Sequence, residues 1–558
     1  MVSGLYAVEI TDSVTECSVV SDCYAVTVEN LSCTEQTLWN GTEWSNGLPD
    51  VDKKAVIEGD LTVTGTMVAC ELLLNSGIVT ISSGAVLTVN GTIENTQSPE
   101  NFIVQNGANL IQTYDVENTG EIKVYKNSSQ IKHLDYTLWA SPVSGQGLRA
   151  FSEETLWYRI YDYNGQDDVW EQVFASPADN DKNFESGIGY MFRAPNDFAT
   201  APYTYNGTFK GVPDNGNITV FFDLQGEYQG TGNPYPSNIG IEYFRTGNPG
   251  VGALYFWTNT NPWDSQEQDY EANNWAIYSG MVGLPAANDD DTNIPNGIIP
   301  VGQGFMIEAP TLLSVAFTNA MRTSNPGVFF KSMEENKHRL WLNFSNETTI
   351  VNQAVVGYME GASQDFDLGI DARLFGYSGS ALYSLIDNNE NKFAIQGRAL
   401  PFDDNDVVLL GFRATEAGGF TVSLTDFDGL FAEGQDIYLK DNFTQTEQNL
   451  KDGSYTFVSQ AGIFDNRFEI TYKQSGTLST TTPNLNHNWV VYKKDETFQI
   501  LSQGFEINQV ILYDMLGRTI YSSQANGHKH SIPYTGANQV LIVKIITTNN
   551  EVLSKKVK

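Results

Sequence analysis

Acidic segments recur in this sequence, and the types and spacing of their residues are suited to binding a metal cation. In one of them, oxygen donors occupy alternate positions, at Asp179, Asp181, Asn183 and Glu185. Hard cations such as Ca2+ bind about six to eight oxygen ligands from loops of this kind. The segment is not an EF-hand, because Phe184 stands where that loop requires glycine and Tyr190 where it requires glutamate. It is our first candidate for a calcium site.

Two further acidic segments are candidates for the same cation. Asp289 and Asp291 belong to the run from residue 288 to 293, and residues 403–406 form the third segment. Asp and Asn also favour turns, because their side chains hydrogen-bond to the local backbone. A solvated turn is therefore the alternative for each segment. We expect Ca2+ at one or more of the three, with residues 179–185 ahead of Asp289 and Asp291.

Residues suited to acid–base or nucleophilic catalysis are scarce. The sequence has five histidines: His133, His338, His487, His528 and His530. His133 and His338 each follow a lysine, which favours an exposed histidine over a general base. The G-x-S-x-G, H-E-x-x-H, phosphate-loop and dinucleotide motifs are missing, and among 67 Asp and Glu any carboxylate pair can arise by chance. The sequence predicts no catalytic residues and no cofactor-binding motif.

Length and composition predict an all-β protein of several domains. A chain of 558 residues is too long for one core and suggests roughly three to five domains. Aromatic residues make up 12% of the chain, with 27 Tyr and 30 Phe, and there are 49 Gly. This is the usage of half-buried strands joined by turns.

The net charge limits the partners. A formal charge of −36 opposes phosphate backbones and anionic lipid surfaces, so binding to nucleic acid and to membrane surfaces is disfavoured. Solubility is the simpler role of this charge, and holding divalent cations is the alternative. No apolar run approaches the length of a membrane span, so we expect no membrane-crossing segment.

The four cysteines, Cys17, Cys23, Cys33 and Cys70, all lie near the N-terminus. Their spacing does not suit zinc, because no CxxC pair or His–Cys spacing occurs. In an oxidising exterior we expect a disulfide among the first three, with a connectivity that the sequence leaves open.

Residues 1–36 contain two stretches, 3–12 and 23–28, in which apolar and polar positions alternate as in a β-hairpin. A lone hairpin is marginal in water. The segment resembles the closing hairpin of an immunoglobulin-like repeat of the kind found in large bacterial surface adhesins. The resemblance implies that the chain is the C-terminal portion of a longer protein.

A weak repeat follows in residues 37–130. Its pattern of glycine followed by Leu or Val starts at three positions: Gly59, Gly84 and Gly107. The offsets, 25 residues (84 − 59) and 23 residues (107 − 84), suit successive coils of a short right-handed parallel β-helix. Each coil would contribute inward residues, namely Leu61, Val63, Leu87, Val89 and Leu110. Ordinary antiparallel hairpins are the alternative, and in both cases these residues belong to a core.

Two β domains are expected between residues 131 and 473. Residues 131–330 are rich in turns and contain six tryptophans: Trp139, Trp157, Trp170, Trp257, Trp263 and Trp275. Residues 305–307 and 315–317 of this region have the character of strands. Residues 331–473 alternate more cleanly, with a strand about every dozen residues, which is typical of a sandwich. Residues 474–485 form a polar linker.

Residues 486–558 are predicted to form a last β-sandwich, because apolar runs of strand length alternate there with polar turns. The module resembles the C-terminal sorting domain of Bacteroidetes proteins that the type IX secretion system exports. The resemblance rests on a turn and a late strand, at Tyr513, Asp514, Gly517, Arg518 and Lys544, and on the basic terminus. It departs from the pattern at residues 536–540, where a glycine–tyrosine pair is usual. We expect Gly517 to adopt a turn conformation that a side chain would strain.

The resemblance implies a secreted or outer-membrane surface protein whose partners are the type IX translocon and its outer-membrane carrier and attachment machinery. Residues 131–475 resemble the ectodomain that often precedes such sorting domains in flavobacterial surface proteins. No signal peptide precedes the first strand-like segment. Because a type IX substrate must first cross the inner membrane, we expect that Met1 is not the natural start.

Two classes of function remain. The first is a non-catalytic surface protein, adhesive or structural, whose sandwiches are spacers and platforms for a surface glycan or protein ligand. The second is a carbohydrate-binding or carbohydrate-active protein, because exposed Trp and Tyr stack on sugar faces. Exposed aromatics aligned on one sheet face would favour sugar binding, two facing carboxylates would favour hydrolysis, and tryptophans scattered through separate cores would favour the structural role. We favour the first class.

Overall fold

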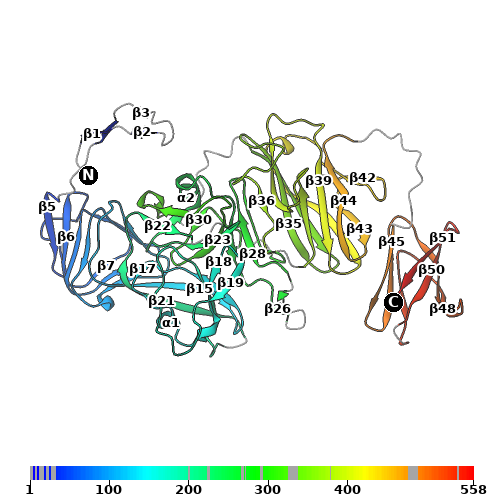
Figure 1. Cartoon of the computed structure of the whole chain (residues 1–558), viewed down its shortest axis with the longest axis horizontal. Helices are drawn as coiled ribbons and strands as arrows, with labels where there is room; N and C mark the ends of the chain where they lie inside the picture. Colours follow the sequence, from blue (N-terminus) through cyan, green and yellow to red (C-terminus); the bar gives the residue numbers. More distant parts are fainter. Residues whose placement is uncertain are drawn as a thin grey trace. The chain divides into compact units, whose positions relative to one another are not determined.

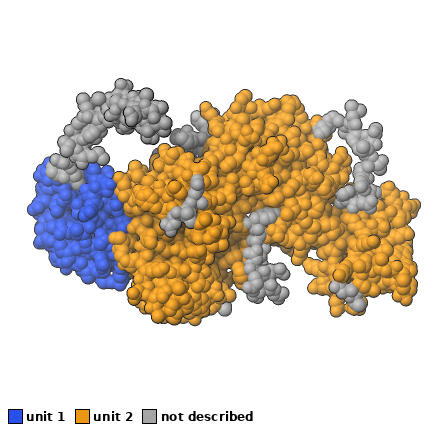
Figure 2. Space-filling view, viewed as in Figure 1, with its two compact units in different colours: residues 1–125, 210–216 blue, residues 126–209, 217–558 orange. Residues whose placement is uncertain are grey.

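The computed structural model describes residues 33–198, 201–222, 226–264, 269–270, 272–289, 293–324, 337–376, 379–474, 488–536 and 539–558, and the backbone of four short strands before residue 33. Strands dominate these ranges and form several sheets (Figure 1), which confirms the predicted all-β, multidomain class. The chain divides into two compact units, residues 1–125 with 210–216 and residues 126–209 with 217–558 (Figure 2).

The strands before residue 33 pair antiparallel, β1 (Gly4–Tyr6) with β4 (Tyr24–Val26) and β2 (Glu9–Thr11) with β3 (Ser18–Val20). Cys17 and Cys23 lie outside the described residues. Cys33 forms a disulfide with Cys70, so a pairing of Cys33 with Cys17 or Cys23 is wrong, and a disulfide between Cys17 and Cys23 stays a prediction. The two partners meet because each lies two residues before a strand of the same sheet, β5 and β9.

Residues 35–131 form a parallel β-solenoid whose coils supply strands to three sheets. The first sheet contains β5 (Glu35–Trp39), β6 (Lys53–Glu58), β9 (Leu72–Ser76) and β12 (Ile93–Asn95). The second contains β7 (Leu61–Val63), β10 (Val79–Ile81), β13 (Phe102–Val104) and β15 (Ile122–Ile131), and the third contains β8 (Thr66–Ala69), β11 (Val86–Val89) and β14 (Asn109–Gln112). The predicted β-helix-like arrangement is therefore confirmed, and the hairpin alternative is wrong.

The predicted repeat aligns three copies, which start at Gly59, Gly84 and Gly107. The strand pairing that it predicts is confirmed for the second and third copies and is wrong for the first and second. Leu87 pairs with Leu110, as the second offset predicts. Leu61 pairs with Val79 instead of Leu87, and the other neighbour of Leu87 is Met67. The Gly59 and Gly84 copies lie in different sheets, because each coil has three strands with buried apolar residues at similar spacing.

Two antiparallel sheets in residues 136–308 carry the aromatic residues of this region. The first has the order β16 (Tyr136–Trp139), β20 (Tyr190–Arg193), β18 (Ile160–Asn164) and β19 (Val169–Gln172). The second has the order β23 (Tyr228–Gly232), β31 (Gly304–Glu308), β25 (Leu254–Trp257), β28 (Trp275–Tyr278) and β29 (Gly283–Leu284). The strands predicted at 305–307 and 315–317 are present as β31 and β32 (Ser314–Phe317).

Helices are short in the described residues. They include α1 (Leu148–Phe151) and α2 (Ile241–Gly247), which caps a core formed with β31 and β32. Among the described residues, helices fall short of the length and apolarity that crossing a membrane would require.

Residues 337–471 form the predicted sandwich-like domain (Figure 1). Its strands follow the order β42 (Thr446–Asn449), β41 (Tyr438–Asp441), β44 (Gly462–Thr471), β39 (Val408–Ala414), β37 (Ala381–Leu385), β38 (Phe393–Ala399), β35 (Ile350–Met359), β34 (Lys337–Asn346), β40 (Gly418–Phe427) and β43 (Tyr455–Ser459), with β36 (Ala372–Arg373) beside β38. One pair, β35 with β38, runs parallel, which departs from the expected antiparallel pattern because β36 and β37 lie between them in the chain. A phenylalanine-rich core lies inside.

The C-terminal module has two sheets around a core of its own. One contains β45 (Trp489–Lys494), β46 (Thr497–Ser502) and β49 (Lys529–Pro533), and the other contains β48 (Thr519–Gln524), β47 (Ile507–Asp514), β50 (Leu541–Thr547) and β51 (Val552–Val557). Trp489, Ile500 and Val543 are fully buried between the sheets. Most of the expected linker, from residue 475 onward, lies outside the described residues.

Candidate functional site

A cavity of about 350 Å3 lies among the aromatic strands of the second unit, and we call it the aromatic pocket. Seven aromatic side chains and two amides line it: Tyr136, Tyr161, Trp170, Trp257, Trp263, Tyr270, Trp275, Asn273 and Asn274. None of its described lining residues carries a charge. The pocket therefore offers ring faces and polar edges without a formal charge.

The first wall of the aromatic pocket comes from the β16–β19 sheet. Successive side chains alternate between the two faces of a strand, so Tyr161 and Tyr163 of β18 share one face. Trp170 of β19 lies opposite Tyr163 in the antiparallel ladder, and their ring centroids are 5.2 Å apart at 62°. The rings of Tyr136 and Tyr161 are 6.1 Å apart. The register of the sheet brings these rings into contact, and the contacts between the rings hold the wall of the pocket in place.

The second wall comes from β25, β28 and the pair β26 (Trp263–Asp264) and β27 (Asp269–Tyr270). Trp257 and Trp275 are register partners whose centroids are 5.1 Å apart. Tyr270 contacts Trp257 at 5.1 Å and Trp263 at 5.2 Å, both edge to face. Trp275 is 6% exposed and Trp263 is 43% exposed. The rings thus lead from a buried inner end to an open rim.

Amide side chains fix the inner end of the pocket. Asn273 accepts a hydrogen bond from the Trp275 backbone N–H (2.9 Å) and donates to the Phe375 carbonyl (2.6 Å). The Asn274 side chain accepts a hydrogen bond from the Asn261 backbone N–H (2.8 Å) and donates one to the Asn261 backbone carbonyl (3.0 Å). These bonds hold the segment before β28 in place. The Trp275 ring, which follows in β28, is therefore already positioned before any ligand binds.

A second cavity, the polar pocket, has a volume of about 570 Å3, and Tyr136 and Trp257 are lining residues of both cavities. Its lining is rich in hydroxyl and amide groups, including Ser128, Thr258, Thr260, Asn293, Asn296 and Gln303. Asn259 supports the shared wall by accepting from the Tyr136 N–H and from Trp257 Nε1, each at 3.2 Å. Phe256 and Ala276 line the polar pocket, whereas Trp257 and Trp275 line the aromatic pocket, so the two cavities lie on opposite faces of the β25–β28 pair.

Two buried carboxylates lie beside the aromatic sheets. Glu308 and Asp371 are both 0% exposed, and burial raises the pKa of each to about 7. Asp371 accepts from the Gly397 N–H (2.6 Å) and the Asp367 N–H (2.7 Å), which opposes that rise in its pKa. Arg373 Nε lies 3.2 Å from Glu308 Oε1, but neither Glu308 oxygen has a hydrogen-bond partner among the described residues. Because this ion pair has poor geometry, desolvation has the larger effect on the pKa of Glu308 and raises it.

The first predicted calcium segment uses its oxygens locally. Asp179 accepts from the backbone N–H groups of Ala175 (2.9 Å) and Ser176 (3.1 Å). Asp181 accepts from Arg149 (2.9 Å) and Ala150 (3.2 Å) in the first turn of α1. The backbone of Asn183 forms a bridge with Gly147, and the Glu185 carbonyl accepts from Ile188.

The other acidic segments are similarly engaged. Asp289 accepts from Thr260 Oγ1 (3.2 Å) and Asn293 Nδ2 (2.8 Å), whereas Asp291 lies outside the described residues. In residues 403–406, Asp406 pairs with Arg398 and Asp404 with Lys473. No cluster of three or more His, Cys, Asp or Glu suited to a metal ion occurs in the described ranges. Calcium stays a prediction.

The predicted sorting residues lie in one turn and in two neighbouring strands, β47 and β50. Asp514 accepts from the N–H groups of Leu516 (2.9 Å) and Arg518 (2.8 Å) and from Arg518 Nε (2.6 Å). These bonds, led by that from the Arg518 backbone, lower the pKa of Asp514. Gly517 has φ = +80°, which confirms the expected turn conformation. Tyr513 precedes the turn in β47, and Lys544 pairs with Ile511 from β50.

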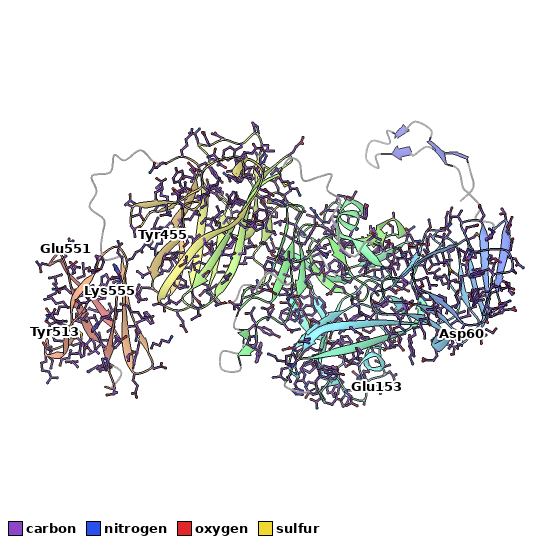
Figure 3. All side chains as sticks on the ribbon, turned by 180° about the vertical axis from the view of Figure 1, so that it is seen from behind. Asp60, Glu153, Tyr455, Tyr513, Glu551 and Lys555 are labelled. Atoms are coloured by element: carbon purple, nitrogen blue, oxygen red, sulfur yellow. A yellow bond between two sulfur atoms is a disulfide. The ribbon has the colours of Figure 1, made fainter. Side chains whose placement is uncertain are left out.

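One lysine of the basic terminus packs against the core of the C-terminal module. Lys555, labelled with Tyr513 in Figure 3, lies over the Trp489 ring at 4.9 Å and donates to the Trp489 carbonyl. Burial lowers the pKa of Lys555 to about 8. Lys556 is exposed, as the alternation of β51 requires, and Lys558, which follows the strand, is exposed too.

Comparison with protein families places most of the chain in one family. Residues 32–472 match the family described as a domain of unknown function (DUF8693), and the chain belongs to that family. Residues 478–558 match a second domain of unknown function (DUF8694). Comparison with curated proteins finds no match.

The sequence did not predict the aromatic pocket as a site. Four of the six tryptophans noted between residues 131 and 330 line it: Trp170, Trp257, Trp263 and Trp275. The available signal was the high local content of tyrosine and tryptophan, with alternation at Tyr161 and Tyr163 and at Tyr255 and Trp257. That signal does not reveal which strands become neighbours.

Proposed function

We propose that this protein is a non-catalytic, carbohydrate-binding protein of the cell surface. The observation that carries the proposal is the aromatic pocket, where seven Tyr and Trp rings gather around one cavity. Sugar rings present apolar C–H faces and hydroxyl edges, and Tyr and Trp provide a flat apolar face with a polar tip. A volume of about 350 Å3 falls within the range of roughly 300–1,000 Å3 that is usual for small-molecule sites.

Charge supports an uncharged sugar unit in this pocket over a cation. Aromatic rings also attract ammonium and guanidinium groups. A desolvated cation, however, needs a counter-ion, and the described lining residues include no carboxylate. The non-catalytic role is supported by the scarcity of catalytic motifs in the sequence.

Binding to a glycan array, followed by calorimetry on the best glycan, tests this function. Trp257→Ala or Trp170→Ala should weaken binding at least tenfold, equivalent to about 1.4 kcal/mol. Trp157→Ala is the matched control, because Trp157 lies in the same region, packs on Tyr158 and does not line the pocket. Equal affinities of the three variants, or no binding to any glycan, would refute the proposal. Cleavage of a bound glycan, detected by mass spectrometry, would refute the non-catalytic part.

We propose further that residues 486–558 direct export by the type IX secretion system and attachment at the outer surface. The support is the resemblance of the module together with the exposure of its turn: Met515 is 57% and Leu516 81% exposed. Residues 474–558 should carry a fluorescent reporter with a signal peptide to the surface of a type IX-competent host. An intact, folded fusion that stays in the periplasm would show that the module is structural.

A further inference from the structure

The N-terminal end of the solenoid has three sheet edges, formed by β5, β7 and β8. The edge of β5 is covered by the turn that follows it, because Trp39 forms a backbone bridge with Trp44 and the Ser45 N–H donates to the Leu38 carbonyl at 2.9 Å. Within the described ranges, no strand pairs with the outer side of β7 or of β8. Two of the three edges are therefore open.

Alternate residues of β7 and β8 direct their backbone N–H and C=O groups toward the open edges. In a parallel sheet, successive residues of a strand bond alternately to one side and to the other. The Leu61 N–H and the Val63 carbonyl of β7 bond to the following coil, at 2.8 and 2.9 Å. The carbonyls of Gly65 and Ala69 bond to that coil at 2.9 Å. The residues whose backbone groups face the open side are therefore Thr62, Thr66 and Val68.

A groove of about 700 Å3 lies along these open edges, and we call it the edge groove. One part of its lining is residues 61–68, none of which is charged. The rest of the lining comes from Trp39, Trp44 and residues 48–51. Leu48 and Val51 are 70% and 55% exposed. Proteins usually protect an open edge with a charge or a proline on the strand or with a covering segment, so an uncharged edge beside exposed apolar side chains is suited to accept a further strand.

The charges around the edge groove define the chemistry of that strand. Asp50 is a lining residue, and the exposed residues Glu43, Asp52 and Asp60 (Figure 3 labels Asp60) adjoin lining residues in the chain. The described lining contains no lysine or arginine. These acids favour a strand that carries Lys or Arg. They oppose a second copy of this chain, because two such ends would bring the same carboxylates together.

We propose that the edge groove binds an extended, basic segment of another protein, which adds as a strand to β7 and β8. Its backbone would bond to the outward N–H and C=O groups, its apolar side chains would contact Leu48 and Val51, and its Lys or Arg side chains would pair with the exposed acids. β7, β8 and the residues between them number nine, from 61 to 69, so a segment of about nine residues would cover both edges. This interaction is independent of the proposed carbohydrate-binding function.

The test measures binding of short peptides to the full chain by fluorescence anisotropy. The probes are labelled nine-residue peptides in which lysine or arginine alternates with valine or leucine. One set of controls has glutamate in place of the basic residues. A second set is methylated at alternate backbone nitrogens, which removes the donors of a strand and keeps the charge, so it controls for general attraction to a chain of net charge −36.

At least one basic peptide should bind tenfold or more tightly than both of its controls. Binding of no basic peptide overturns the proposal. Equal binding of the glutamate peptide would show that the acids do not select the partner, and equal binding of the methylated peptide would show that no strand is added.

Thr66→Pro removes one outward N–H and leaves the bonds of Gly65 and Ala69 to the following coil in place, as proline on an edge strand allows. It should weaken binding of the best peptide at least fivefold. Thr66→Val is the matched control, because it keeps the N–H, and it should change the affinity less than twofold. Leu48→Lys alters an exposed side chain without touching the strands and should also weaken binding at least fivefold. Unchanged affinity in Leu48→Lys and in folded Thr66→Pro overturns the site.

Hydrogen exchange locates the added strand without any variant. The amides of Thr62, Thr66 and Val68 should become protected when the best basic peptide is added, and the methylated peptide should not protect them. Protection of these amides in the free chain would overturn the proposal, because the edges would already be covered. Sedimentation would then show whether a second copy of the chain covers them.

Discussion

Two aromatic clusters in this protein differ in the type of ring and in what the rings surround. In the sandwich, Arg467 is surrounded by Phe457, Phe468, Phe443 and Phe412, with its Cζ 4.4, 5.0, 5.3 and 6.0 Å from their ring centroids. Its Nη2 also donates to Asp441 Oδ2 at 2.8 Å. In the aromatic pocket, Tyr and Trp rings surround a cavity of about 350 Å3.

The difference shows that ring type and charge, more than aromatic content, separate a core from a site. Phenylalanine has no polar group, so a phenylalanine cluster can close around an internal ion pair without leaving an unsatisfied donor. Tyrosine and tryptophan carry a hydroxyl or an N–H that needs a partner, and an open pocket supplies one through solvent or ligand. The internal guanidinium has its own carboxylate, whereas the described pocket lining has none.

The largest effect is expected when the buried charge of Arg467 is removed from the phenylalanine cluster of the sandwich. Arg467→Met leaves Asp441, which is 0% exposed, without its ion partner, and should lower the free energy of unfolding by about 3–5 kcal/mol. Lys440→Met is the control, because Lys440 pairs with Glu469 on the same two strands at 2.8 Å but in a partly exposed setting. It should cost about 1 kcal/mol or less. Equal losses in urea unfolding would mean that burial of the ion pair is irrelevant.

The stability of the protein should depend on pH through two buried carboxylates, Glu308 and Asp371. The pKa values of Glu308 and Asp371 rise from 4.5 and 3.8 to about 7 on folding, so the folded state prefers their protonated forms. Their favourable contribution is complete below about pH 4 and is lost as the pH rises through about 7. The loss should be on the order of 2–4 kcal/mol per group.

The measurement is the melting temperature between pH 5 and 8 for the unmodified protein and Glu308→Gln. Carboxylates that do not interact with Glu308 contribute equally to both proteins, so the difference reports Glu308 and its coupling to Asp371. The variant should lose less stability than the unmodified protein as the pH rises. Parallel curves would show that Arg373 keeps Glu308 ionised throughout.

Exchanging one hydroxyl sharpens the distinction between ring types. Phe457→Tyr places a hydroxyl in a fully buried position and should destabilise by about 1–3 kcal/mol, because the group lacks a partner. Tyr161→Phe removes a hydroxyl at the pocket wall and should change stability by about 0.5 kcal/mol or less. Thermal unfolding of both variants checks this, and a neutral Phe457→Tyr would mean that the cluster admits water.

The smallest effect on stability is expected at the rim of the aromatic pocket. Trp263 is 43% exposed, so Trp263→Ala should change the free energy of unfolding by about 0.5 kcal/mol or less. Binding of the best glycan should weaken by roughly fivefold, equivalent to about 1 kcal/mol. Calorimetry and thermal unfolding of the same preparation give both numbers. A large stability loss with unchanged affinity would assign Trp263 to the fold.

Much of the fold could be predicted from local pattern, and the candidate site could not. The Leu87 to Leu110 register follows from a 23-residue offset (110 − 87) that repeats within one sheet. The Leu61 register could not be predicted, because Val79 and Leu87 are both apolar strand residues at a suitable distance. Likewise Trp170 and Trp257 each suit a strand, and their separation of 87 residues (257 − 170) hides that they line one cavity.

The sequence by itself determined the period-two alternation, the turn at Gly517 and the net charge, since these depend on neighbouring residues or on composition. Tertiary structure alone decided the partner of Cys33 and the meeting of two sheets around the aromatic pocket. The physical reason is range. Strand patterns arise from contacts a few residues apart, whereas a pocket arises where distant strands pack and leave a volume unfilled.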